Sequence, residues 1–197
     1  GAGLGGVAAS GERMHPLHAM VPVNAAAIAL HELGKPSIAK VNGDAVGAGM
    51  NLALGCDLIV AGESARFSEI FARRGLSLDF GGSWLLPRLV GMHKAKELAF
   101  FADILSAREA ERMGLVNRVV PDAELDAFVA DWAERLSTSA PLALQLSKKL
   151  LSNAFSIGLS EALDAEAAAQ SVNLVSEDTK EGVRAFLEKR KPAFRGR

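Results

Sequence analysis

The chain has 197 residues, 49% of them hydrophobic and 23% charged, and its formal net charge is −1. This composition is typical of a folded globular protein and excludes disordered and collagen-like chains. The near-neutral charge argues against generic nucleic-acid binding. Charged or turn residues interrupt every apolar run before it reaches membrane-spanning length, so no membrane partner is expected.

The first residues favour a loop followed by a helix. Residues 1–12 are rich in Gly, Ala and Ser. Their GAGLGG segment has the glycine spacing of a dinucleotide-binding turn, but that motif needs a preceding strand, which is not in the sequence. His15 and His18 are placed in a loop without accompanying Cys or acidic residues, so no metal site is expected. A helix is predicted over 22–33, ended by Gly34.

A strand, a helix and a second strand are predicted next. SIAKVN (37–42) reads as a short strand, MNLALGC as a helix and DLIVA (57–61) as a buried strand. The Asn-Gly pair at 42–43 favours a hairpin turn, but an Ala- and Leu-rich helical segment follows in place of a second strand. The spacing therefore predicts a crossover that joins two parallel strands.

Helices dominate the rest of the chain. Apolar residues with helical spacing predict helices over 81–90, 92–102, 106–113, 122–138, 141–154, 159–175 and 177–190. VNRVV (116–120) reads as one late strand. We therefore expect an α/β region over 1–121 and a helical region over 122–197, whose apolar stripes pack on their own domain or on another subunit.

The stretch GDAVGAGMNLALG places three glycines where a helix begins. The first N–H groups of a helix have no acceptor inside it and carry the positive end of the helix dipole. Gly47 and Gly49 let a ligand approach the backbone closely, so this helix start can stabilise a developing oxyanion. The alternative is that small residues here serve only tight packing of the helix on a strand.

The remaining candidates for chemistry are carboxylates. Asp79 lies between Leu78 and Phe80, just before Gly-Gly and a new helix. It can cap that helix, or its apolar neighbours can raise its pKa and make it a proton carrier. Glu63 is placed in a solvated turn, and Glu69, at the end of a short extended segment, is a second-rank candidate.

Two further features allow competing interpretations. Residues 181–197 hold six basic and two acidic residues, which is consistent with a solvated terminal helix or with a site for a phosphorylated ligand or an acidic partner surface. The single cysteine, Cys56, excludes an internal disulfide and suggests a reducing, cytoplasmic location. Its apolar neighbours favour a packing role over a nucleophilic one.

Several segments together resemble the enoyl-CoA hydratase/isomerase (crotonase) superfamily. They are KPSIAKVNGDAVGAGMNLALGCDLIVAGESARFSE, GLSLDFGGSWLLPRLVG, LSAREAERMGLVNRVVP and EGVRAFLEKRKPAF. GAGLGG is similar to the family's Gly-Ala-Asp-Leu segment, with Gly3 at the Asp position. The resemblance implies a spiral core of strands and helices followed by a helical trimerisation region. It also implies that the family's first strands and helix, which precede that segment, are missing here.

The same resemblance assigns a binding site. The N–H groups of Ala2 and Ala48 would hold the thioester oxygen of an acyl-CoA, beside Gly3, Gly47 and Gly49. The apolar acyl chain would lie against Leu4, Val46, Phe71, Leu76 and Leu78. The coenzyme A phosphates would bind Lys189, Arg190 or Lys191, of the same or a neighbouring subunit. No metal or redox cofactor is implied, since coenzyme A enters as part of the substrate, and a homotrimer or a dimer of trimers is expected.

Departures from the family pattern narrow the expected reaction. Hydratases of the family use two glutamates, but this chain has Asn51 at the first position and Phe71 at the second. Glu69 would lie about 7 Å from the second position along an extended strand. Asp79, in contrast, lies where some isomerases of the family keep an acid. The resemblance therefore favours a double-bond isomerase with Asp79 as proton carrier, over a hydratase that uses other groups and over a non-catalytic CoA- or RNA-binding relative.

Overall fold

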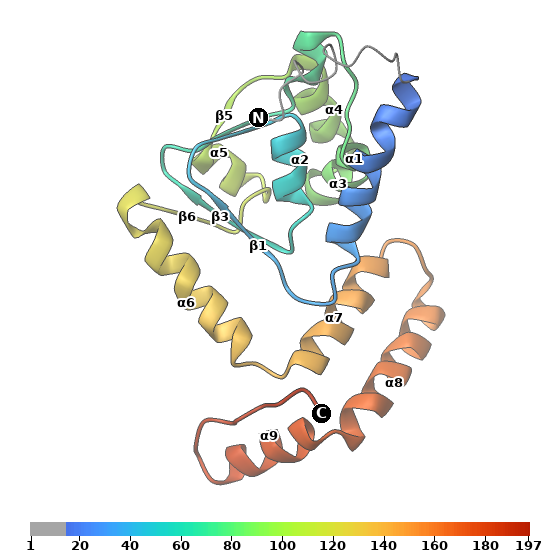
Figure 1. Ribbon diagram of the computed structural model, residues 1–197, viewed down its shortest axis with the longest axis vertical. Coiled ribbons are helices and arrows are strands. Elements are labelled where there is room, and N and C mark those ends of the chain that lie inside the picture. Colours follow the sequence, from blue (N-terminus) through green and yellow to red (C-terminus); the bar gives the residue numbers. More distant parts are fainter. Residues whose placement is uncertain (1–14) are drawn as a thin grey trace. The chain divides into compact units, whose positions relative to one another are not determined.

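The computed structural model describes residues 15–197, which form two compact units. Within the described residues, the first unit comprises 15–31 and 38–126, and the second comprises 32–37 and 127–197. The first unit combines strands and helices, and the second is helical (Figure 1). The α/β class with a helical C-terminal region is confirmed.

Helix α1 (Pro16–His31) begins earlier than the helix predicted over 22–33. Pro22 lies inside α1, although proline lacks the N–H that an interior helical position donates. The surrounding Leu, Met and Ala residues have high helix propensity and continue the helix through it. His18 therefore belongs to a helix and not to the expected loop.

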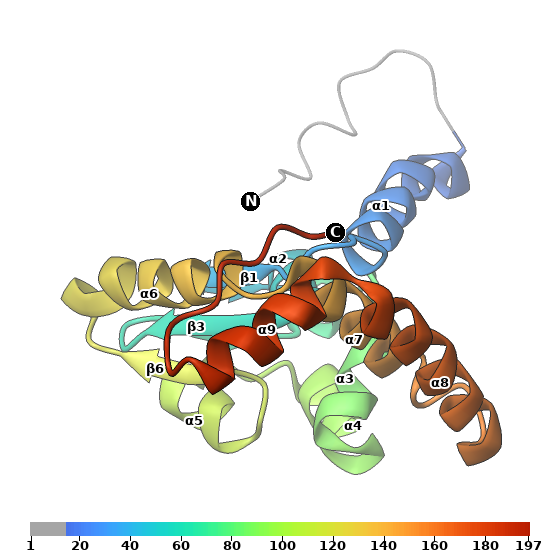
Figure 2. The same ribbon diagram turned by 90° about the horizontal axis from the view of Figure 1, so that it is seen from below.

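The first sheet has three parallel strands in the order β1–β3–β6 (Figure 2). They are β1 (Ile38–Val41), β3 (Leu58–Gly62) and β6 (Arg118–Val120). Ile38 lies opposite Leu58, and the two strands run parallel. The predicted crossover between these strands is thus confirmed, as is the late strand.

The second sheet has the order β2–β4–β5, with β2 parallel to β4 and β5 antiparallel to it. Its strands are β2 (Asp44–Val46), β4 (Arg66–Ser68) and β5 (Leu105–Ser106). The expectation that no second strand follows the Asn-Gly pair was wrong. A strand of three residues is too short to show a period-two pattern, and β2 pairs with a distant strand instead of forming a hairpin.

Helices pack on these strands to form the core of the first unit. They are α2 (Ala48–Leu54), the 3₁₀ turn η2 (Ile70–Arg74), α3 (Gly82–Val90), α4 (Met92–Phe101), α5 (Ala107–Arg112) and the 3₁₀ turn η3 (Asp122–Glu124). Met50, Phe67 and Leu86 are fully buried in this core. Because Met50 lies on α2, burial of this side chain fixes the short helix against the strands and positions its first residue, Ala48.

The second unit is built from the rest of α6 (Leu125–Ser137) and from α7 (Pro141–Asn153), α8 (Leu159–Val175) and α9 (Glu177–Leu187). Pro141 occupies the first turn of α7, where its missing N–H has no helical acceptor to lose. Within residues 15–197, every helix is too short or too polar to span a bilayer.

Candidate active site

The fully buried side chain of Asn51 connects two acidic residues that are far apart in sequence. Its Nδ2 donates a 3.4 Å hydrogen bond to Oε2 of Glu69 and a 3.0 Å hydrogen bond to the backbone oxygen of Asp79. Both amide hydrogens are therefore committed. The structure thus brings together Asn51 on α2, Glu69 between β4 and η2, and Asp79 ahead of α3.

Glu69 faces the interior because the chain turns immediately after β4. Strand β4 ends at Ser68, and Glu69 is the first flanking residue of η2, with φ −81° and ψ 59°. The stretch from Glu69 to Phe71 therefore enters a 3₁₀ turn and is not the extended strand on which the expected 7 Å separation was based. Glu69 is only 1% exposed, which is rare for a glutamate. The sequence signal for a buried Glu69 is that it is the only acid in RFSEIF and is followed directly by Ile70 and Phe71.

Asp79 does not cap α3. The residue that flanks the helix start is Gly81, in the left-handed region at φ 82°, and no side chain caps the helix there. The backbone oxygen of Asp79 accepts a hydrogen bond of 2.9 Å from the N–H of Gly82. The Asp79 carboxyl thus makes no capping hydrogen bond to α3, and the hypothesis that Asp79 serves as a helix cap is wrong.

Because Gly82 has no side chain, the Asn51 amide has room to lie against it. A Cβ atom at position 82 would approach Nδ2, Oδ1 and Cγ of Asn51 to between 2.3 and 2.6 Å. Real Cβ atoms essentially never make contacts this short. The second glycine of the Gly-Gly pair is therefore required by the close approach of α2 and α3.

At the start of α2, the buried Gly47 has a positive φ and the next residue, Ala48, is exposed. Gly47 has φ 56° and ψ −126°, which favours glycine, and its N–H binds the oxygen of Ser68 at 2.8 Å. Ala48 is the first residue of α2 and is exposed. A Cβ at Gly49 would meet no described atom within 4 Å, so neither packing nor backbone strain accounts for that glycine.

Burial perturbs both acids of the cluster. It raises the pKa of Glu69 to about 7, while the Asn51 hydrogen bond lowers this pKa and the charge of Asp79 raises it further. Burial also raises the pKa of Asp79. Among the described residues, Oε1 of Glu69 and Oδ1 of Asp79 are buried without a hydrogen-bond partner. Paired perturbed acids of this kind are typical of sites that move protons.

The expected acyl-binding residues differ in exposure. Val46 and Leu76 are 40% and 49% exposed, and Leu78 is half-buried. Phe71 is buried, with its ring 3.5 Å from the position of a Cβ at Gly47. These residues can contribute apolar surface, and their role as acyl walls stays a prediction. Ala2, Gly3 and Leu4 lie outside the described residues.

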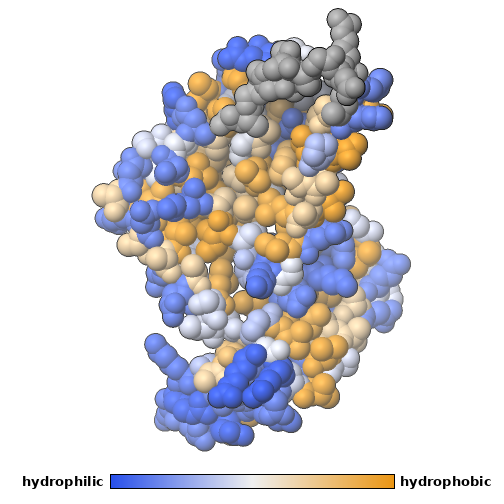
Figure 3. All heavy atoms as spheres, viewed as in Figure 1, coloured by the Kyte–Doolittle hydropathy of each residue, from blue (hydrophilic) through white to orange (hydrophobic). Residues whose placement is uncertain are grey.

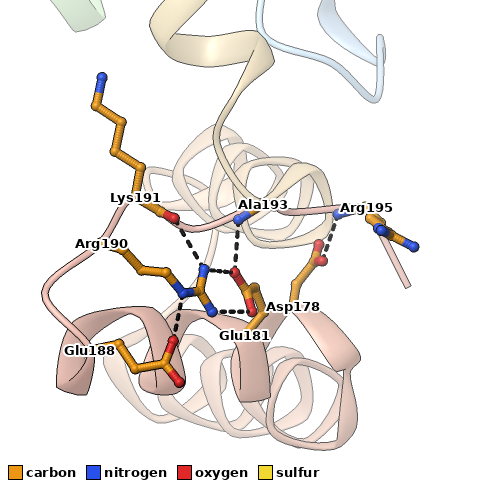
Figure 4. Close-up of polar contacts among 7 residues, drawn as sticks. All are labelled: Asp178, Glu181, Glu188, Arg190, Lys191, Ala193 and Arg195. Atoms are coloured by element: carbon orange, nitrogen blue, oxygen red, sulfur yellow. Dashed lines mark hydrogen bonds and ion pairs between the residues drawn. The ribbon is translucent and has the colours of Figure 1, made fainter.

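The basic C-terminal segment forms a clamp within the second unit (Figure 4). Arg190 Nη1 and Nη2 bind the two carboxylate oxygens of Glu181 at 2.5 and 2.9 Å, and its Nε binds Glu188 at 2.6 Å. Lys191 directs its side chain away from this cluster (Figure 4). Arg190 would have to leave Glu181 to bind a phosphate of coenzyme A, so of the three expected phosphate ligands it is the least available.

Metal-ligating side chains do not converge in the described part of the chain. Residues 15–197 contain no group of three or more His, Cys, Asp or Glu side chains placed to hold a metal ion. His15 and His18 have ring centroids 6.0 Å apart but lack further ligand partners of this kind. The described residues of the site supply carboxyls, an amide and backbone N–H groups.

Comparisons with known proteins identify relatives along nearly the whole chain. The family model described as enoyl-CoA hydratase/isomerase matches residues 6–197. A probable enoyl-CoA hydratase of Rhodobacter capsulatus is 44% identical over 173 residues, which cover 86% of this chain and 66% of that protein. The 1,2-epoxyphenylacetyl-CoA isomerase of Escherichia coli is 42% identical over 168 residues, covering 85% of this chain and 64% of that protein.

A solved structure agrees with these matches. The crystal structure of an enoyl-CoA hydratase from Bacillus anthracis superposes with a TM-score of 0.93 at 34% identity, covering 98% of this chain and 75% of that one. The chain spans slightly less than two thirds of the length of the curated relatives named above. On the evidence of both sequence and fold, the chain belongs to the enoyl-CoA hydratase/isomerase family.

Proposed function

We propose that this protein moves the carbon–carbon double bond of an enoyl-CoA from the 3- to the 2-position, with Asp79 as proton carrier. The observation that carries the proposal is the Asp79 carboxyl, which is half-buried, has a raised pKa and caps no helix. The two positions that hydratases of the family fill with glutamate hold Asn51 and the buried Phe71.

The proposed reaction needs one proton carrier and one oxyanion site. The ionised Asp79 takes a proton from C2, and the electrons of that C–H bond move toward the thioester oxygen to give a conjugated enolate. The same carboxyl then returns the proton at C4, which places the double bond between C2 and C3. A raised pKa suits this role, because the group must both accept and release a proton near neutral pH.

The oxyanion would be held by the N–H of Ala48 and, as the family resemblance implies, by that of Ala2. Ala48 begins α2 and has no acceptor for its N–H within the helix. The open space at Gly49 supports this placement, since a thioester could lie close to the backbone there without meeting a side chain of residues 15–197. Developing charge at such preorganised donors is strongly stabilised.

A hydratase is the second candidate, and Glu69 is the observation in its favour. Glu69 supplies a second buried carboxyl next to Asp79, so the site holds two acids even though the two family positions are changed. Several relatives carry hydratase names, among them the crotonyl-CoA hydratase of Syntrophomonas wolfei. Water activation would then require Glu69 and Asp79 to act together.

We further propose that the protein is a homotrimer or a dimer of trimers that joins through the second unit. An apolar cavity of about 530 Å³ lies between α7 and α8. Large apolar side chains are exposed nearby, including Leu151, Phe155 and Leu159, and orange spheres mark exposed apolar residues in the lower part of Figure 3. Such a surface is typical of subunit contacts. A monomer mass at micromolar concentration would contradict this proposal.

The reaction is tested by comparing two assays on matched variants. Wild type, Asp79→Asn and Glu69→Gln are assayed for isomerisation of a 3-enoyl-CoA and for hydration of crotonyl-CoA, with the exposed Glu63→Gln as control. Asp79→Asn should lower isomerisation by roughly a hundred- to ten-thousand-fold, the usual effect of losing a general acid or base. Its melting temperature should change little, because Asp79 caps no helix.

Other outcomes lead to other assignments. Rapid hydration without isomerisation, lost in both acid variants, would support the hydratase. Full isomerase activity in Asp79→Asn would show that the proton carrier is wrong. Tight acyl-CoA binding without turnover in either assay would support a non-catalytic relative.

A further inference from the structure

Glu69 is connected to the proposed proton carrier through a single buried amide. Asn51 donates one hydrogen to the Glu69 carboxyl and the other to the backbone oxygen of Asp79. Asn51 is fully buried and lies against Gly82, so its side chain is closely enclosed. Displacement of the Glu69 carboxyl therefore reaches the main chain of Asp79 through Asn51.

The protonated form of Glu69 fits this place better than the ionised form. Glu69 receives one long hydrogen bond, and its Oε1 has no partner among the described residues. An ionised carboxylate buried with so few donors is costly, whereas a neutral acid is tolerated. These contacts agree with the raised pKa of Glu69, which lies at about 7.

The charged groups on the surrounding elements do not offset a charge on Glu69. Helix α2 has no ionisable side chain. Arg66 on β4 pairs with Asp44, Arg73 on η2 pairs with Asp103, and Lys94 on α4 pairs with Glu97. Arg74 on η2 and His93 and Lys96 on α4 are exposed. The Arg88 guanidinium of α3 lies 3.9 Å from the centre of the Trp84 ring. Asp79 is the charged group that acts on Glu69, and it acts by repulsion.

We propose that Glu69 is a positioning residue that holds Asp79 in place through Asn51 and must carry its proton when the acyl-CoA binds. The proton is needed because the bound acyl chain excludes water from both acids. This inference rests on the proposed acyl-CoA function. Substrate covers the site and raises the cost of a second buried charge, so the substrate selects the form with neutral Glu69. Glutamine at position 69 imitates that form, since its amide oxygen can accept the Asn51 hydrogen bond.

The first measurement is the pH dependence of kcat/KM for isomerisation, which reports groups of the free enzyme. Wild type should lose about tenfold in kcat/KM per pH unit above about pH 7. Glu69→Gln should lack this fall and lose less than about tenfold at pH 6. Glu69→Leu, which cannot accept the Asn51 hydrogen, should be slower at every pH. The exposed Glu63→Gln should keep the wild-type profile.

The second measurement needs no turnover. Binding of butyryl-CoA, a saturated thioester that cannot isomerise, is followed by calorimetry at about pH 8 in buffers of different ionisation enthalpy. Wild type should take up close to one proton per thioester bound, because Glu69 is ionised in the free protein at this pH and protonated in the complex. Glu69→Gln has no such group and should take up none.

The outcomes separate this inference from the proposed function. Coincident pH profiles and equal proton uptake for wild type and Glu69→Gln would overturn the role of Glu69, while a strong loss in Asp79→Asn would leave the isomerase assignment standing. A loss in Glu69→Gln as large as that in Asp79→Asn would make Glu69 a proton carrier and also overturn the positioning role. Absence of acyl-CoA binding would overturn both proposals.

Discussion

Gly82 and Asn51 occupy one space between α2 and α3, and only a residue without a side chain fits beside the amide. The amide cannot simply move aside, because Asn51 is fully buried and both its amide hydrogens are bound. The contact makes the Gly-Gly pair part of the arrangement that holds Asp79. It also makes the first residue of α3 a determinant of the candidate site.

We predict that Gly82→Ala both destabilises the protein and slows isomerisation. Overpacking of a filled site typically costs about 1–3 kcal/mol, which exceeds the helix propensity of about 1 kcal/mol gained by Ala over Gly. Gly43→Ala is the matched control, because a Cβ there meets no described atom within 4 Å and its φ is not positive. Equal unfolding free energies for the two variants, measured in urea, would contradict the steric argument.

Ala48→Pro removes one expected N–H donor to the thioester oxygen. Loss of such a donor typically lowers the rate by roughly a hundred- to a thousand-fold. Proline is tolerated in a first helical turn, and Gly47 before it already has a non-helical conformation. The variant should therefore remain folded by circular dichroism and bind coenzyme A. Unchanged turnover in a folded variant would show that the donor lies elsewhere.

Gly49→Ala separates stability from substrate binding. In the free protein a Cβ at this position meets no described atom, so Ala inside α2 should stabilise by about 0.5–1 kcal/mol. A thioester lying close to the same backbone would meet the new methyl group, so KM for the acyl-CoA should rise. Higher stability together with an unchanged KM would remove Gly49 from the binding site.

Glu69→Gln should stabilise the protein in a pH-dependent way. The pKa of Glu69 is raised from 4.5 to about 7 in the folded state, so the folded protein binds more protons and wild-type stability falls as pH rises between these values. The full penalty, about 3 kcal/mol, is reached above pH 7. The difference in unfolding free energy between Glu69→Gln and wild type should accordingly be small near pH 4 and largest near pH 8. A difference independent of pH would contradict the assignment.

Arg190→Lys should loosen the C-terminal segment although it keeps the positive charge. Arg190 binds both carboxylate oxygens of Glu181 and lowers the pKa of that group to about 2, and lysine cannot form this forked contact. The variant should be cleaved faster by trypsin near the C-terminus. Lys191→Ala removes a side chain that points away from the clamp (Figure 4) and should protect the segment as wild type does. Equal cleavage rates in Arg190→Lys and wild type would show that the clamp does not hold the segment.

The parts of the fold predicted from the sequence are those governed by local patterns. Long amphipathic helices such as α7 and the parallel pairing of β1 with β3 follow from periodicity and spacing. Strands of two or three residues, such as β2 and β5, have no readable period, and the proline inside α1 argued for a later helix start.

The sequence can propose a candidate only where a single residue carries the signal. Asp79 was proposed from its apolar neighbours and from the family resemblance, and its role as proton carrier stays a prediction. The approach of Glu69 to Asn51 depends on a single backbone turn after β4, which no periodicity reveals. Three residues separated by 18 and 28 positions are brought together by packing of α2 against α3, so the amide bridge becomes visible only in three dimensions.

The amide bridge also constrains the order in which this sequence can change. A glutamate at position 51 would place a carboxylate against the backbone oxygen of Asp79 and, whenever Glu69 is ionised, against a second carboxylate, in a space already closed by Gly82. Replacement of Glu69 by a neutral residue first removes the repulsion. The effect of a glutamate at position 51 is therefore expected to depend on the residue at position 69. Evolution toward a glutamate at position 51 is favoured when Glu69 is replaced first and disfavoured when Asn51 is replaced first.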